Sequence, residues 1–121
     1  YDFDDDDMII KMTGRYRFKN RDFLNLVEGH PEADAIVKCD RSNFSCGYVL
    51  TGCFALKCKF FREFLNGLDL CEMEEKSRDI EILMAAYIRH LIDRSKNVIF
   101  VDKLGLIANI GGNCPPVNKE L

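Results

Sequence analysis

A strand-like segment near the N-terminus ends in a cluster of polar residues. Three apolar residues begin the run 8–18, and the run turns polar at Thr13, Gly14, Arg15 and Tyr16. In open α/β sheets, ligands bind outside the carboxyl ends of the strands, so this cluster would lie at a ligand-binding edge. Lys11 and Arg15 could both reach an anion there, and arginine is suited to bidentate contact with phosphate. The segment therefore predicts an anion-binding strand end.

A second candidate is a pair of carboxylates, Asp79 and Glu81, in the first turn of the longest expected helix. Acidic side chains at this position are stabilised by the helix dipole, which is reason enough for their presence. A carboxylate held at a helix start can also act as a general base. Because the helix that follows is apolar enough to be anchored in a core, its first turn would be held rigidly near the sheet edge. Both interpretations stay open.

The third candidate is the segment 51–57, in which Thr51 and Gly52 interrupt a strand-like run. A glycine there lets the backbone bend or lets a ligand approach it closely. A simple bulge explains Gly52 equally well. Cys53 follows directly and would lie beside it.

Strands and helices are expected to alternate along the chain. Strand signals cover 8–12, 35–39, parts of 46–57, 98–101 and 104–110. A short helix is expected after Asn20, a second one over 60–68, and a long one after Ser77, whose apolar positions follow helical spacing: Ile80, Leu83, Met84, Tyr87, Ile88 and Leu91. This alternation predicts an α/β fold, a layered mixed sheet with flanking helices.

Length and composition favour one globular domain over 1–121, with a loose tail at 111–121. The chain has 121 residues, 47% of them hydrophobic and 31% charged, and a net charge of −3. That charge gives no electrostatic footprint for nucleic acid. No apolar run approaches the roughly 20 residues that span a bilayer, and the acidic N-terminus is the reverse of a signal peptide.

Aspartate and cysteine offer little further chemistry. Five of the first seven residues are aspartates, which are expected to form a solvated acidic turn because they lack the spacing of a calcium loop. Six cysteines include no CxxC pair, so zinc and redox sites are disfavoured. Reduced thiols and a cytoplasmic location, with peripheral membrane attachment left open, follow from the missing secretion signal.

Three segments in order give the chain a resemblance to a known family. Residues 9–16 resemble the "IxKxTGRY" segment of bacterial and viral nucleotide-sugar glycosyltransferases with a GT-A-like fold. Residues 51–57 resemble a "G-x-F-x-(I/L)-(K/R)" strand of the acceptor half of such enzymes. Residues 77–81 occupy the place of the "ED"-type motif that begins a long helix in these enzymes. The resemblance covers about residues 7 to 110.

The resemblance implies an inverting transfer of a hexose from a nucleoside diphosphate sugar to a glycan acceptor. Glu81 matches the carboxylate that deprotonates the acceptor hydroxyl, with Asp79 as its neighbour. Gly52 and Cys53 would line the donor or acceptor pocket. GT-A enzymes often hold Mn²⁺ or Mg²⁺ with an Asp-x-Asp at a strand end, but the matching strand here ends in 13–16. Lys11 and Arg15 would then supply the positive charge for the leaving diphosphate.

The resemblance also implies that the nucleotide-binding half of a GT-A domain lies outside these 121 residues. The chain would then be the C-terminal part of such an enzyme, and its open sheet edge would favour self-association. The alternative is a non-catalytic α/β module that binds a carbohydrate or a protein. In that case 13–16 is only a tight turn, and Asp79 and Glu81 only stabilise a helix start.

Overall fold

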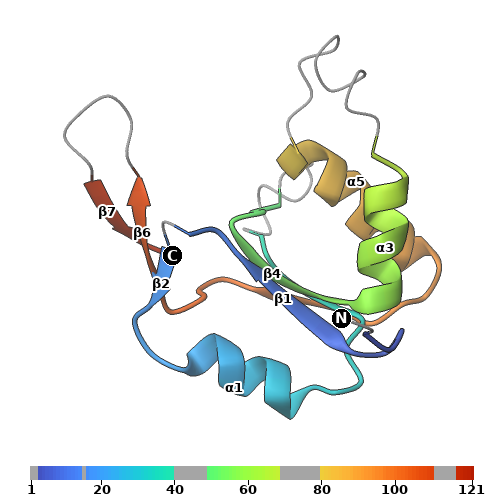
Figure 1. The fold of residues 1–121 in the computed structure, drawn as a ribbon, viewed down its shortest axis with the longest axis horizontal. Helices are drawn as coiled ribbons and strands as arrows, with labels where there is room; N and C mark the ends of the chain where they lie inside the picture. The colour runs from blue at the N-terminus through green and yellow to red at the C-terminus, as the bar shows by residue number, and fades with distance from the viewer. Residues whose placement is uncertain (1–2, 15, 40–48, 69–79, 111–116) are drawn as a thin grey trace, which may run out of the picture.

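A computed structural model describes residues 3–14, 16–39, 49–68, 80–110 and 117–121 (Figure 1). The fold is mixed α/β. Its described helices are α1 (Asp22–Gly29), α3 (Cys58–Asn66) and α5 (Ile80–Asp93). The described strands are β1 (Met8–Met12), β2 (Tyr16–Phe18), β3 (Ala35–Lys38), β4 (Cys53–Lys57), β5 (Val98–Val101), β6 (Leu106–Ile110) and β7 (Val117–Glu120). The expected helices and strands are confirmed wherever the chain is described.

The main sheet has the order β1-β4-β3-β5. β4 runs antiparallel to both of its neighbours, and β3 runs parallel to β5. The strands β1, β3 and β5 therefore share one direction, and their carboxyl ends meet at one edge with the start of β4. Among the described strands, β1 and β5 are the terminal strands of this sheet.

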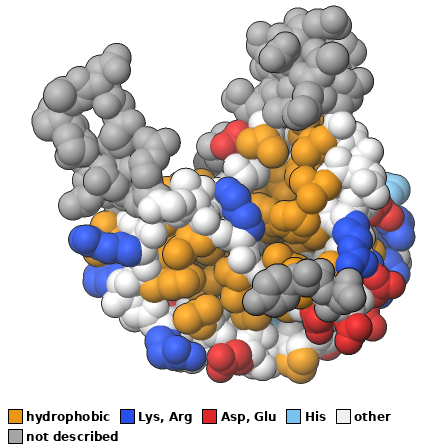
Figure 2. Space-filling model, in the orientation of Figure 1, with side chains coloured by type: hydrophobic (Ala, Val, Ile, Leu, Met, Phe, Trp, Pro, Cys, Tyr) orange, Lys and Arg blue, Asp and Glu red, His pale blue; other side chains and the backbone are white. Residues whose placement is uncertain are grey.

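The acidic N-terminal run forms a turn before β1, as the sequence predicted. The Asp7 N–H donates to the Asp4 carbonyl at 3.0 Å, which closes the turn. Asp5 and Asp6 pair with Arg62 and Lys59 of α3, each at 2.9 Å. Figure 2 shows acidic side chains gathered near the N-terminus with basic ones beside them. These exposed ion pairs tie the turn to α3 at the end of the sheet opposite the predicted site.

A second sheet has the order β2-β6-β7 and lies at the left in Figure 1. Its third strand corrects the expectation of a loose tail over 111–121, because Val117–Glu120 pairs antiparallel with Leu106–Ile110. The chain end is held as well: the Leu121 N–H donates to the Leu106 carbonyl at 2.9 Å. Proline and glycine marked the break at 111–116 but carried no information about the strand that follows them.

The α1 side of the main sheet is closed by one hydrophobic cluster. Phe23 of α1 is buried against residues of the sheet and of the chain around β6, which include Ile36, Ala55, Leu104 and Leu106. At the start of α1, Asn20 Oδ1 accepts a hydrogen bond from the Asp22 N–H at 3.0 Å. Asn20 thus satisfies one helix donor from one residue outside the N-cap position, which is Arg21.

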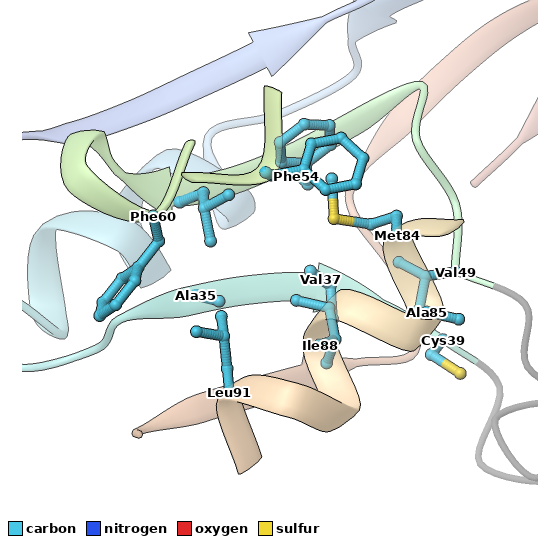
Figure 3. Close-up of a cluster of buried hydrophobic side chains, with 12 residues drawn as sticks. Ala35, Val37, Cys39, Val49, Phe54, Phe60, Met84, Ala85, Ile88 and Leu91 are labelled. Carbon is cyan, nitrogen blue, oxygen red and sulfur yellow. The ribbon is translucent and has the colours of Figure 1, made fainter. Parts of the chain in front are cut away.

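The opposite face is covered by α3 and α5 (Figure 1). Met84, Ile88 and Leu91 of α5 meet the alternate residues Ala35 and Val37 of β3 in a buried cluster (Figure 3). The predicted helical spacing is therefore the core stripe of α5. Because α5 is anchored along its length, its first turn is held at the end of the sheet where β1 and β3 finish.

The two helices on this face are also joined by polar contacts. Tyr87 of α5 donates to Glu63 of α3 at 2.9 Å, and Arg94 contacts the same carboxylate at 2.7 Å. Burial and this hydrogen bond raise the pKa of the Tyr87 phenol. Among the described helices, none has the length and the apolar character that crossing a membrane requires.

Candidate functional site

The predicted site segments meet at one edge of the main sheet. β1 ends there, β4 begins there, and α5 places its first turn beside them. The Thr13 N–H donates to the Gly52 carbonyl at 2.7 Å, which extends the β1–β4 pairing beyond the strands. Residues that are about forty positions apart in sequence therefore become neighbours at this edge.

Lys11 is fixed at this edge by two hydrogen bonds. Its Nζ donates to Thr13 Oγ1 at 3.0 Å and to the Thr51 carbonyl at 2.7 Å. Lys11 stands opposite Phe54 in the register, so both side chains lie on the face that α3 and α5 cover. Two of the three ammonium protons have acceptors among the described residues, which leaves one for an anion.

Glu81 is connected to the same point through Thr51. The Thr51 hydroxyl donates to Glu81 Oε1 at 3.1 Å, and the Val49 N–H contacts the Glu81 carbonyl at 3.4 Å. The start of α5 therefore lies against the segment that leads into β4. Glu81 is partly buried, so it remains reachable from solvent.

The turn after β1 connects this strand to β2. The Tyr16 N–H donates to the Thr13 carbonyl at 3.0 Å, which brings the chain round into β2. Gly14 is exposed, and a Cβ built on it would meet nothing within 4 Å. Arg15, which is predicted from the sequence to bind an anion, lies outside the described residues.

Gly52 and Cys53 do not have the positions expected of pocket-lining residues. A Cβ on Gly52 would lie 2.1 Å from Cε2 of Tyr16. The space beside this glycine is therefore filled by an aromatic ring of the protein itself. Cys53 is fully buried and its side chain lies in the cluster on the α1 side, away from Lys11. Burial raises the pKa of the Cys53 thiol to about 11, although Lys11 opposes the shift. The thiol is thus held as a neutral hydrophobic group.

The donor atoms of the described residues at this edge do not make up a site for a divalent metal. Hard cations take several oxygen ligands, mainly carboxylates. Glu81 is the described carboxylate that contacts the segment before β4, and Asp102 follows β5 at the other side of the sheet, while Asp79 and Ser77 lie outside the described residues. Within the described chain, no group of three or more Asp, Glu, His or Cys side chains could hold a metal ion. Lys11 is the described cation that contacts Thr51, the residue to which Glu81 is also bonded.

The sequence did not single out Thr51, which joins the cation to the carboxylate. Its signal was present: a hydroxyl residue stands directly before Gly52, the glycine that precedes β4. The three described cysteines, Cys39, Cys53 and Cys58, are buried. The arrangement at the edge places one ammonium and one carboxylate around a single buried threonine.

Comparisons with known proteins give no information about the function of this chain. No protein-family model, no curated protein and no solved structure matches the chain. What the site can do must therefore be argued from Lys11, Thr51 and Glu81.

Proposed function

We propose that the protein is a glycosyltransferase that moves a hexose from a nucleoside diphosphate sugar to a glycan acceptor with inversion. The observation that carries the proposal is the shared contact of Lys11 and Glu81 with Thr51 at the carboxyl end of the sheet. This kind of transfer needs positive charge beside the leaving diphosphate and a base beside the attacking hydroxyl. The edge supplies one of each.

Glu81 and Lys11 each have one role in the proposed transfer. Glu81 accepts the proton of the acceptor hydroxyl, and the acceptor oxygen forms a bond to the anomeric carbon of the donor. The bond between that carbon and the diphosphate oxygen breaks, and the diphosphate leaves with the electron pair. The free proton of the Lys11 ammonium stabilises the charge that develops on the diphosphate. Glu81 returns its proton to solvent.

Donor binding is tested first, by calorimetric titration with a panel of UDP-, GDP- and CMP-sugars, with and without Mn²⁺. We expect saturable binding of one donor that Lys11→Met weakens at least tenfold. The matched control is Lys59→Met, because Lys59 pairs with Asp6 at the opposite end of the sheet. Equal losses in the two variants would contradict the role of Lys11.

Transfer is tested next with Glu81→Gln. We expect transfer to fall at least a hundredfold while donor affinity stays within about twofold, since a base contributes on the order of 10²–10⁴ to the rate. Asp93→Asn, at the far end of the same helix, serves as the control and should keep full activity. An active Glu81→Gln variant would refute the assignment of the base. Absence of donor binding throughout the panel would favour the non-catalytic binding module.

A further inference from the structure

We propose that Thr51 is a positioning residue that fixes Glu81 for proton transfer and keeps it apart from Lys11. The inference rests on the proposed function and adds to it a residue that touches no substrate itself. It is carried by contacts of Thr51 through two different groups. The hydroxyl reaches Glu81, and the backbone carbonyl reaches Lys11.

The first support is the burial of Thr51. It is 7% exposed, the one buried polar residue among the described residues. A hydroxyl on a largely buried residue has few alternatives to its protein acceptor, which favours the bond to Glu81 Oε1. Threonine is also restricted at χ1 because it is branched at Cβ. The hydroxyl is therefore directed at Glu81 from a side chain with little rotational freedom.

The second support is the anchoring of the backbone around Thr51. The carbonyl of Gly52 accepts from the Thr13 N–H at 2.7 Å, and the Leu50 N–H donates to the Lys38 carbonyl at 3.2 Å. Thr51 is thus held from both sides, by residues that follow β1 on one side and end β3 on the other. A donor mounted on this segment keeps its place when the substrate arrives.

The third support is the separation of the two charges. No ion pair joins Lys11 and Glu81 directly within the part of the chain that the structure describes. Opposite charges that share a partner would otherwise be expected to form an ion pair. In such a pair Lys11 would lose a donor proton and Glu81 an acceptor oxygen that the reaction needs. With Thr51 between them, Lys11 keeps one proton for the diphosphate, and Glu81 keeps its second oxygen for the acceptor hydroxyl.

The test compares Thr51→Val with Thr51→Ser. Valine has the same shape but no hydroxyl, and it leaves the carbonyl contact of Lys11 in place. Serine keeps the hydroxyl. The first readout is independent of activity: NMR couplings of the Glu81 side chain report whether it holds one rotamer. The second readout separates kcat from donor affinity.

We expect Glu81 to hold one rotamer in the wild type and in Thr51→Ser, and to average over several in Thr51→Val. We expect kcat to fall about tenfold or more in Thr51→Val, with donor affinity changed less than about twofold, because a hydrogen bond to a charged group is lost. Thr51→Ser should recover most of the rate.

A Glu81 side chain that stays fixed in Thr51→Val would overturn the inference, and so would a kcat equal to that of the wild type. A loss confined to thermal stability, with kcat unchanged in the folded fraction, would also overturn it. If no variant or wild type transfers a sugar, the proposed function fails, and the rotamer measurement still decides whether Thr51 positions Glu81.

Discussion

The replacement of Gly52 by alanine tests the packing at the candidate edge. The new Cβ would lie 2.1 Å from Cε2, 2.3 Å from the hydroxyl oxygen and 2.4 Å from Cζ of Tyr16. Ordinary contact begins at 3.4 Å, so the ring must withdraw by about 1.3 Å, the difference between 3.4 and 2.1 Å. Tyr16 is partly buried and packs against the cluster on the α1 side, so a shift of its ring disturbs those contacts.

We expect Gly52→Ala to lower the free energy of unfolding by about 1–3 kcal/mol, the usual cost of overpacking. In a domain of this size that loss lowers the Tm by on the order of 5–15 °C. Chemical denaturation followed by circular dichroism gives the free energy, and calorimetry gives the Tm.

Gly14→Ala is the matched control within the same edge. A Cβ there meets nothing within 4 Å, and the φ of Gly14 lies outside the left-handed region. We expect its unfolding free energy to stay within about 0.5 kcal/mol of the wild type, or to rise through the lower entropy of the unfolded chain.

A double-mutant cycle with Tyr16→Ala completes the test. Once the ring is gone, Gly52→Ala should cost less than about 0.5 kcal/mol, so the two substitutions should be strongly non-additive. The reasoning is refuted if Gly52→Ala is as harmless as Gly14→Ala. It is refuted equally if the full loss persists in the absence of the ring.

Three further predictions concern groups around the core. Burial opposes ionisation of Asp34, but hydrogen bonds from the Asn97 N–H and from Lys57 outweigh burial and lower the pKa of this carboxyl. The ionised carboxylate therefore stabilises the fold above about pH 4, and this stabilisation is lost as the pH falls below that value. Asp34→Asn should therefore show a smaller drop in unfolding free energy between pH 5 and pH 3 than the wild type; an equal drop contradicts the linkage. The Cys53 thiol, with its pKa near 11, should resist alkylation at pH 8 in the folded protein and react only on unfolding, as followed by mass spectrometry. Tyr87→Phe should cost about 1 kcal/mol in denaturant titrations, because it removes the hydroxyl that joins α5 to α3.

Local pattern was sufficient to predict most helices and strands of this protein. The spacing of Met84, Ile88 and Leu91 predicted α5, and the burial of these side chains confirms the face. The rule that ligand sites lie beyond the carboxyl ends of strands directed attention to residues 13–16, whereas Gly52 was selected as a possible backbone bend and Glu81 as a carboxylate at a helix start. Periodicity is a property of neighbouring residues, so a sequence alone can report it.

The tertiary structure alone decided which of these residues touch. The hydrogen bonds that Thr51 makes with Lys11 and Glu81 span 40 and 30 positions of the chain. They depend on the pairing of β1 with β4 and on where α5 begins against the sheet. No local pattern contains the register of a strand pair.

Two corrections have the same physical origin. Cys53 follows Gly52 directly, but side chains alternate between the faces of a strand, so its thiol is buried on the α1 side and away from Lys11. The strand at Val117–Glu120 exists because β6 offers it a partner, and its own sequence does not require it. Local patterns in the sequence predicted most of the described helices and strands, whereas strand pairing and side-chain direction decided which side chains meet at the edge of the main sheet.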